Sequence, residues 1–169
     1  MLIAMIVAMD NDSSIGQDGS LPWKLSSDIK RFKKITLGDG NNAVIMGRKT
    51  WDSLPGKYKP LSGRINIVMS RDSDWSDEGA WNALYPGRAI EIAYSEGCEE
   101  CWIIGGSQIY ELFIDRVDEI HITEVNANNS GEIKFPEWQR DGWRQDIIEK
   151  ILKNEENDYD TKYSIWKKD

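Results

Sequence analysis

Three short segments place glycine, hydroxyl groups or cations directly after an apolar run. Gly47-Arg48-Lys49-Thr50 follows AVIM, Ser70-Arg71 follows NIVM, and Gly105-Gly106-Ser107 follows CWII. Free backbone N–H groups at a helix start, together with guanidinium and hydroxyl groups, are the donors that hold phosphate. If the three apolar runs are neighbouring strands, their ends meet at one edge of a sheet and can hold a ligand with several phosphates.

The same segments limit which phosphate-containing ligand is expected. Their spacing matches neither a Walker A loop nor the usual G-x-G-x-x-G motif. Arg71, a single arginine just beyond a strand, suits an additional phosphate on a ribose. The segments therefore favour NADPH over NADH as the bound dinucleotide.

Asp28 is a second chemical candidate, in the segment IGQDGSLPWKLSSDIKRFKKITLG. The pattern predicts a helix that Ser26 or Ser27 can cap and that Gly38 can end. Asp28 lies on its apolar face, and the basic residues lie on the other side. The apolar face carries Leu25, Ile29, Phe32 and Ile35, and the basic side carries Lys30, Arg31, Lys33 and Lys34.

Two interpretations of Asp28 stay open at this point. An acidic residue in the first turn stabilises a helix through its dipole and can take part in capping. Alternatively, the carboxylate lies in an apolar pocket and accepts two parallel hydrogen bonds from a flat group resembling a guanidine. Burial without such a partner would cost several kcal/mol in order of magnitude, so a ligand or water would have to satisfy it.

Other reactive residue types lack partners for chemistry. His121 lies on an alternating strand without a recognisable Ser or Cys partner, so we interpret it as a partly exposed structural histidine. Cys98 and Cys101 form one C-x-x-C pair in a chain with a single histidine, too few ligands for a zinc site. We expect two reduced thiols and no bound metal.

Strands and helices alternate through most of the chain. Continuous apolar runs predict buried strands at Ile3 to Met9, Ala43 to Gly47, Arg64 to Ser70 and CWIIGG, and EIHITEV alternates like another strand. Intervening segments such as GRAIEIAYSEG and SQIYELFI read as helices, which favours right-handed crossovers and a largely parallel sheet. The long loop from Asp10 to Trp23 is typical of a lid. In the tail, the spacing of DIIEKILK predicts a helix over residues 146–153, whereas TKYSIWK alternates like a strand.

Bulk properties limit the class of protein. The 169 residues are enough for one domain with a real core, and a net charge of −8 argues against general affinity for nucleic acid or anionic membrane. The apolar N-terminus lacks a basic leader and reaches Asp10 too early for a spanning helix. We expect a cytoplasmic, monomeric protein with one domain over residues 1–169.

Taken together, these motifs resemble dihydrofolate reductase. The similarity runs in order through IVAMDNDSSIGQDGSLPWKLSSDIKRFKKIT, VIMGRKTWDSL, LSGRINIVMSR, WIIGGSQIYELF, IHITEV and FPEW. The resemblance implies an α/β fold: a mixed, mainly parallel eight-stranded sheet with four flanking helices, ending in an antiparallel hairpin. That hairpin replaces the helix that local spacing indicates for the tail, since tertiary context can override periodicity.

The resemblance also implies a substrate site. In the family, the residue matching Asp28 grips the 2-amino and ring N–H edge of the pterin, which is a flat group with two adjacent donors. Thr123 would brace the carboxylate, Trp23 would hold an ordered water, and Arg64 would pair with the α-carboxylate of the glutamate tail. Leu21 is assigned to the catalytic group with Asp28, Trp23 and Thr123. The apolar walls around the substrate would be Ile6, Ala8, Ile29, Phe32, Leu54 and Ile104.

The implied cofactor is NADPH. Residues matching the adenosine-phosphate positions are Arg48, Lys49, Thr50, Ser70 and Arg71, and those matching the pyrophosphate turn are Gly105, Gly106, Ser107, Gln108 and Ile109. Ala8, Ile15, Gly16 and Tyr110 would border the nicotinamide, and Gly19, Ser20 and Gly47 are also assigned to the cofactor. The family has a cis peptide between the two glycines of the turn.

The implied reaction reduces 7,8-dihydrofolate to 5,6,7,8-tetrahydrofolate, which supplies one-carbon carriers for thymidylate and purine synthesis. Asp28 would fix the pterin and raise its basicity while water delivers the proton, and the loop from Ile15 to Trp23 would exclude bulk water. Burial should raise the pKa of Asp28, and activity should fall with rising pH. Antifolates are expected inhibitors. The alternatives are a reductase of the same fold acting on a pyrimidine intermediate of riboflavin synthesis, and a non-catalytic nucleotide-binding protein.

Overall fold

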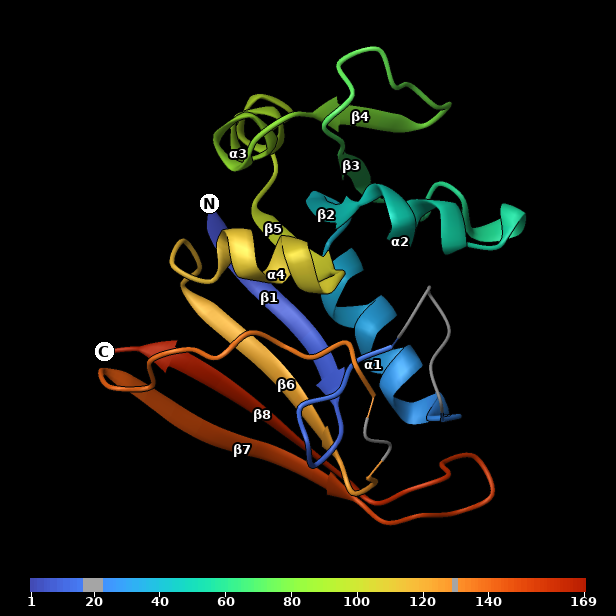
Figure 1. The fold of residues 1–169 in the computed structure, drawn as a ribbon, viewed down its shortest axis with the longest axis vertical. Helices are drawn as coiled ribbons and strands as arrows, with labels where there is room; N and C mark the ends of the chain where they lie inside the picture. The colour runs from blue at the N-terminus through green and yellow to red at the C-terminus, as the bar shows by residue number, and fades with distance from the viewer. Residues whose placement is uncertain (17–22, 129–130) are drawn as a thin grey trace.

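An eight-stranded sheet, with the strand order β4-β3-β2-β5-β1-β6-β8-β7, organises the part of the chain that is described (Figure 1). The computed structural model describes residues 1–16, 23–128 and 131–169. The strands are β1 (Leu2–Met9), β2 (Asn42–Gly47), β3 (Ile65–Met69), β4 (Ala80–Ala83), β5 (Glu100–Gly105), β6 (Glu119–Val125), β7 (Trp143–Ile151) and β8 (Thr161–Lys168). The helices are α1 (Ser26–Leu37), α2 (Arg48–Ser53), α3 (Pro86–Ser95) and α4 (Ser107–Phe113), with a 3₁₀ turn at Gly56–Tyr58.

The sheet is parallel from β4 through β6 and antiparallel at β8 and β7. The predicted fold class is therefore confirmed, including the final hairpin. β4 is a short strand that the apolar pattern alone does not indicate. None of the helices in the described ranges combines the length and apolar character needed to span a bilayer.

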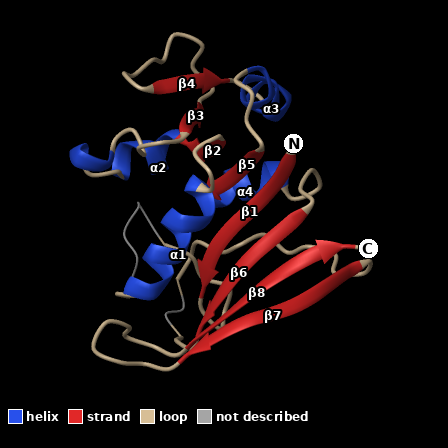
Figure 2. Cartoon of the chain, turned by 180° about the vertical axis from the view of Figure 1, so that it is seen from behind, coloured by secondary structure: helices blue, strands red, loops and turns tan. Residues whose placement is uncertain are grey.

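Helices cover both faces of the sheet, which explains why its central strands are apolar throughout. On one face, Met5, Ile45 and Ile103 pack against residues of α3 and α4 such as Ile92 and Phe113. On the other face, a second cluster holds Val44, Met46, Val68, Trp51 and Trp102, and Ile35 of α1 packs against it. Figure 1 looks onto the face with α4, and Figure 2 looks onto the face with α1.

The tail corrects the local prediction of a helix over residues 146–153. Residues 143–151 form β7, the edge strand that pairs with β8 in an antiparallel ladder. Ile147, Ile148 and Leu152 are 52%, 54% and 74% exposed, so their helical spacing does not mark a buried face. A register irregularity between Ile147 and Glu149 interrupts the alternation that would have indicated a strand.

The start of α1 also differs from the prediction. Leu25 occupies the N-cap position without a side-chain cap, so neither Ser26 nor Ser27 caps the helix. Instead, the Ser27 N–H donates to Asn157 Oδ1 (3.1 Å), which belongs to the connection between β7 and β8. The prediction for the other end is confirmed, because Gly38 ends the helix with φ of +51°.

Candidate active site

The carboxylate of Asp28 is turned toward the sheet rather than capping its own helix. Thr123 Oγ1 of β6 donates to Asp28 Oδ1 at 2.6 Å, and Thr123 is 3% exposed. The Asp28 side chain keeps 22% of its surface exposed. Burial raises the pKa of Asp28 above 3.8, while the hydrogen bond from Thr123 and the nearby charge of Arg31 act to lower the pKa. The site thus holds a half-buried acid next to a fixed donor.

Arg31, which the pattern groups with three lysines on the basic side of the helix, is less exposed than those lysines. Its side chain is only 12% exposed. Nη1 lies 3.4 Å from Asp28 Oδ1, and Nη2 donates to Glu149 Oε2 at 2.9 Å. The guanidinium carbon lies 4.3 Å from the centroid of the Tyr163 ring. Arg31 therefore joins α1 to β7 and β8 beside the acid, a role that the grouping with the lysines does not indicate.

The residues predicted as apolar walls gather on the same face of the sheet. Ile6, Leu54 and Ile104 are partly buried and pack against the cluster around Trp51 and Trp102. Ala8 pairs with Thr123 in the register of β1 and β6. Phe32 is also partly buried. Ile29, one position after Asp28, leaves 58% of its surface exposed on α1. Apolar surface therefore remains accessible around the carboxylate.

Trp23 lies directly before α1 and is 7% exposed, packed with Leu25, Val125 and Ala127. Its Nε1–H is buried and has no hydrogen-bond acceptor in the described part of the chain. Such a donor calls for a partner, which a water or ligand can provide. The predicted site residues Gly19, Ser20 and Leu21 lie outside the described residues, as does much of the predicted lid.

Arg64 approaches the opposite end of α1. Its Nη1 donates to Thr36 Oγ1 (2.9 Å) and its Nε donates to the Ser62 carbonyl (3.0 Å). Burial lowers the pKa of Arg64 from its ordinary value. Because Asp28 and Thr36 are eight residues apart on α1, the two charged groups mark positions roughly 12 Å apart along the helix axis. The Asp28 carboxylate and the Arg64 guanidinium thus lie near opposite ends of α1, about as far apart as the two ends of an extended small molecule.

The three phosphate-type segments lie at neighbouring strand ends, as predicted. β3, β2 and β5 are adjacent and parallel, and they end at Met69, Gly47 and Gly105. α2 starts at Arg48 and α4 starts at Ser107. The peptide between Gly105 and Gly106 is cis, as the resemblance implies. Arg48, Lys49 and Arg71 are exposed at this edge, whereas Ser70 is buried. Gln108 and Thr50 belong to α4 and α2.

The glycine turn leaves room for a ligand to approach the backbone. A Cβ built on Gly106 would meet only Thr50 Oγ1, at 3.8 Å. A Cβ on Gly47 would lie 3.0 Å from a carbon of Ile109, so the strand end and α4 are in close contact. Ile15 and Tyr110 are buried in the core on this side, and Gly16 is partly buried. Tyr110 donates its hydroxyl to the Ile6 carbonyl at 2.8 Å, which ties α4 to β1.

His121 is buried, which corrects its prediction as partly exposed. It is 6% exposed and lies between Tyr163, 2.5 Å from Nδ1, and Glu119, 2.8 Å from Nε2. The carboxylate of Glu119 can only accept, which assigns the proton of the neutral ring to Nε2 and leaves Nδ1 to accept from Tyr163. Burial lowers the pKa of His121, although Glu119 opposes this. The structural interpretation of this histidine fits these contacts.

Sequence reasoning missed the group that surrounds Arg31. The spacing of Asp28 and Arg31 at i and i+3 was an available signal, since such residues are neighbours on a helix. Glu149 and Tyr163 could not be linked to them, because the local pattern placed Glu149 on a helix. Their meeting depends on tertiary contacts between α1 and the β7–β8 hairpin.

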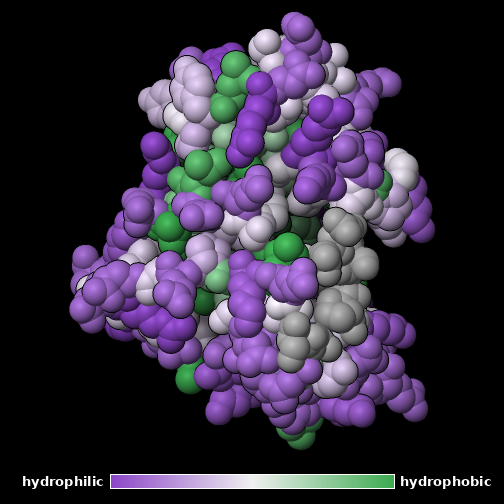
Figure 3. All heavy atoms as spheres, in the orientation of Figure 1, coloured by the Kyte–Doolittle hydropathy of each residue, from purple (hydrophilic) through white to green (hydrophobic). Residues whose placement is uncertain are grey.

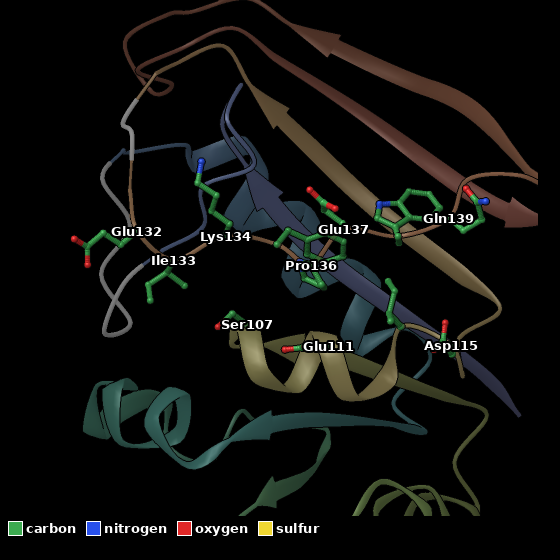
Figure 4. Close-up of a pocket in the computed structure, with 12 residues that line it drawn as sticks. Ser107, Glu111, Asp115, Glu132, Ile133, Lys134, Pro136, Glu137 and Gln139 are labelled. Atoms are coloured by element: carbon green, nitrogen blue, oxygen red, sulfur yellow. The ribbon is translucent and has the colours of Figure 1, made fainter.

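A separate hollow of about 900 Å³ lies between α4 and residues 132–139 (Figure 4). Its lining includes Glu111, Asp115, Glu132 and Glu137, with Lys134 as the cation. Ser107 is the one predicted site residue in the lining, so the hollow is distinct from the surroundings of Asp28. Within the described residues, no three His, Cys, Asp or Glu side chains are placed to hold a metal ion. Hydrophilic residues dominate this face of the molecule (Figure 3).

Comparisons with known proteins agree with this arrangement. A family model described as dihydrofolate reductase matches residues 2–168. A dihydrofolate reductase of Bacillus subtilis is 35% identical over 167 residues, covering 99% of this chain and 95% of the relative. One from Neisseria gonorrhoeae is 41% identical, covering 85% and 84%. A solved dihydrofolate reductase from Enterococcus faecalis, complexed with NADP(H) and RAB-propyl, superposes with a TM-score of 0.83 at 28% identity, covering 99% of this chain and 96% of that one.

Proposed function

This chain belongs to the dihydrofolate reductase family, and we propose that Asp28, Thr123 and Arg64 hold its substrate while the ends of β2, β3 and β5 hold its cofactor. The enzyme catalyses NADPH-dependent reduction of 7,8-dihydrofolate to 5,6,7,8-tetrahydrofolate. The match over residues 2–168 leaves no support for the riboflavin-pathway reductase or for a non-catalytic protein.

The single observation that carries the residue assignment is the accessible, braced carboxylate of Asp28. Thr123 holds Oδ1 from β6, and 22% of the Asp28 side chain stays exposed. A carboxylate accepts two parallel hydrogen bonds from a flat group with adjacent N–H donors. The 2-amino and ring N–H edge of a pterin is such a group.

Arg64 supports the same orientation at the other end of α1. Contacts with Thr36 and Ser62 fix its Nη1 and Nε, and the guanidinium suits a carboxylate geometrically. The pterin would lie at Asp28 and the glutamate tail at Arg64. The half-buried side chains of Ile6, Leu54 and Ile104 would then contact the rings between them.

The cofactor edge fits a dinucleotide phosphate. Space above Gly106 allows close approach to the backbone, and Arg48, Lys49 and Arg71 supply exposed positive charge. When bound, NADPH supplies the hydride for the reaction. The residues at the strand ends would bind and orient it, and Tyr110 would hold its helix against β1 through the bond to Ile6.

In this proposal Asp28 binds the pterin and changes the basicity of its ring through its negative charge. It grips one edge of the pterin, so it does not reach the ring nitrogen that gains the proton. Its negative charge raises the basicity of the ring, and water delivers the proton. Because the reaction takes up a proton from solvent, we expect activity to fall as pH rises.

Asp28→Asn tests the assignment. The change keeps the shape and removes the charge, so two charge-assisted bonds weaken and kcat/KM should fall by about a hundredfold or more. The assay follows dihydrofolate-dependent loss of NADPH absorbance near neutral pH, with block by a diaminopyrimidine antifolate. Asp39→Asn, an exposed acid just beyond α1, is the matched control. Wild-type turnover by Asp28→Asn would show that the assigned role is wrong.

The remaining proposals concern the oligomeric state, the cellular compartment and inhibition by antifolates. We infer that the chain acts as a single-domain monomer in the cytoplasm and is inhibited by antifolates that present two adjacent N–H donors to Asp28. One sheet includes strands from Leu2 to Lys168, and Cys98 and Cys101 are free thiols. Light scattering in solution should give a mass near 19.4 kDa. A mass of twice that value would overturn the monomer.

A further inference from the structure

We propose that Arg31 is a positioning residue for Asp28: held by Glu149 and Tyr163, its guanidinium contacts Oδ1 and orients the carboxylate whose two oxygens receive the substrate. The inference rests on the proposed role of Asp28. It adds a specific device from the β7–β8 hairpin to the substrate site.

Arg31 is fixed by three different contacts. One arm of its fork, Nη2, bonds Glu149 Oε2 at 2.9 Å, and the flat group lies over the Tyr163 ring at 4.3 Å. The other arm reaches Asp28 at 3.4 Å, a longer and weaker contact. With 12% of its side chain exposed, Arg31 has little freedom to leave. The bond to Glu149, the contact with Tyr163 and the burial of the side chain together set where its charge lies relative to Asp28.

The Tyr163 ring, over which the Arg31 guanidinium lies, is itself held in place by further contacts. Its hydroxyl contacts His121 Nδ1 at 2.5 Å, and His121 Nε2 contacts Glu119 at 2.8 Å. Trp102 packs edge-on against the same imidazole, with ring centroids 4.8 Å apart. Lys167 lies 3.7 Å from the Glu119 carboxylate and completes the row. The buried polar row holds the ring of Tyr163 in place, so the cation above it is held as well.

The geometry divides the two oxygens of Asp28. Thr123 and Arg31 both contact Oδ1, and within the described ranges no side chain bonds Oδ2. Oδ1 is therefore the anchored oxygen, and a flat pair of ligand donors can bond Oδ2 while sharing Oδ1 with Thr123. Because the contacts to Oδ1 come from two elements, β6 and α1, they restrict rotation of the carboxylate, and a planar pair of N–H donors requires a fixed plane.

Arg31 also favours the charged form of Asp28. Burial raises the pKa of this carboxyl group, and Thr123 and Arg31 oppose the rise. The other titratable groups facing the pair are Tyr110 and Tyr163, whose pKa values are raised, so both are neutral near pH 7. Glu149 carries the opposing negative charge on the far arm of Arg31, and Glu119 lies behind His121. Arg31 is thus the cation in contact with Asp28 among the described residues.

Arg31→Met tests this role, because methionine fills the buried space without the charge. We expect KM for dihydrofolate to rise roughly three- to tenfold, with a smaller change in kcat. Loss of the cation raises the pKa of Asp28, so the acid limb of the pH profile of 1/KM should move to higher pH. Arg31→Lys restores charge and should return the limb toward its wild-type position. Lys30→Met removes an exposed cation on the same helix and is the matched control. Its KM for dihydrofolate and its pH profile of 1/KM should both match those of wild type.

The outcomes separate this inference from the proposed function. If Arg31→Met matches wild type in KM and pH profile while Asp28→Asn is inactive, the role of Arg31 is refuted and the function stands. If Asp28→Asn is also fully active, the proposed function fails. Should Arg31→Met not fold, Glu149→Ala keeps the arginine and removes the acceptor of its outer arm. It should raise KM in the same direction by a smaller factor, and an unchanged KM would overturn the proposal.

Discussion

Gly105→Ala is the substitution whose effect can be worked out most directly from the geometry. Gly105 ends β5 with φ of +114°, a backbone conformation that side chains with Cβ rarely adopt. An added Cβ would lie 3.2 Å from two ring carbons and the hydroxyl oxygen of Tyr110. Tyr110 cannot move aside easily, because it is 4% exposed and its hydroxyl bonds the Ile6 carbonyl.

Two terms contribute to the expected loss of stability. An alanine at this φ costs about 1–3 kcal/mol of backbone strain. Forcing one extra carbon into a packed site costs about 1–3 kcal/mol more. Together they predict a decrease of roughly 2–6 kcal/mol in the free energy of unfolding. For a chain of this size, the decrease corresponds to a Tm lowered by about 4–24 °C.

Thermal and urea unfolding of the ligand-free protein measure this decrease. Gly56→Ala is the control, because Gly56 has no positive φ and a Cβ there would meet nothing within 4 Å. We expect Gly56→Ala to differ from wild type by less than about 1 kcal/mol. If Gly105→Ala were as stable as Gly56→Ala, the strained turn against Tyr110 would be refuted.

Two further predictions concern the acid and its brace. Thr123→Val keeps the volume and removes the 2.6 Å bond to Asp28, so KM for dihydrofolate should rise by about tenfold in steady-state kinetics; an unchanged KM would contradict the bracing role. Because burial raises the folded-state pKa of Asp28 above 3.8, the native protein holds a proton that the unfolded chain releases. The stability contributed by the neutral acid is present below pH 3.8 and is lost as pH rises through the folded-state pKa. Urea unfolding at several pH values should therefore show that the free energy of unfolding of Asp28→Asn increases relative to wild type as pH rises through the folded-state pKa. A difference between the two proteins that does not change with pH would refute the raised pKa.

The sequence predicted the parts of the fold that depend on local pattern. Apolar runs such as Ala43 to Gly47 marked strands buried on both faces, and glycines marked the ends of α1 and β5. The adjacency of the three phosphate-type strand ends followed from parallel topology rather than from any one motif. Asp28 was recognised as unusual from its position among apolar neighbours, although pattern alone left its role undecided.

The errors lie where distant segments meet. The apolar spacing of Ile147, Ile148 and Ile151 imitates a helix, because the strand is at the sheet edge and does not need to bury one face. Arg31 looks like its exposed lysine neighbours in sequence, and only the hairpin that brings Glu149 and Tyr163 under it makes it a buried cation. The cap of α1 comes from Asn157, which is 130 residues away from Ser27 along the chain. No local rule could supply these contacts.

The strand order explains how the proposed substrate site and the proposed cofactor site can be held at a fixed distance from each other. The cofactor segments follow β2, β3 and β5, whereas Asp28 is braced by β6, and β1 lies between β5 and β6. The bond from Tyr110 to Ile6 crosses this boundary and joins the helix after the glycine turn to the strand that carries Ala8. Hydride transfer needs the two reacting atoms near contact distance, so a strand shared by both sites is where their separation is set. β1 is bonded by Tyr110 on one side and paired through Ala8 with Thr123 on the other, so in the proposed arrangement its position would link the binding of the cofactor to the binding of the pterin.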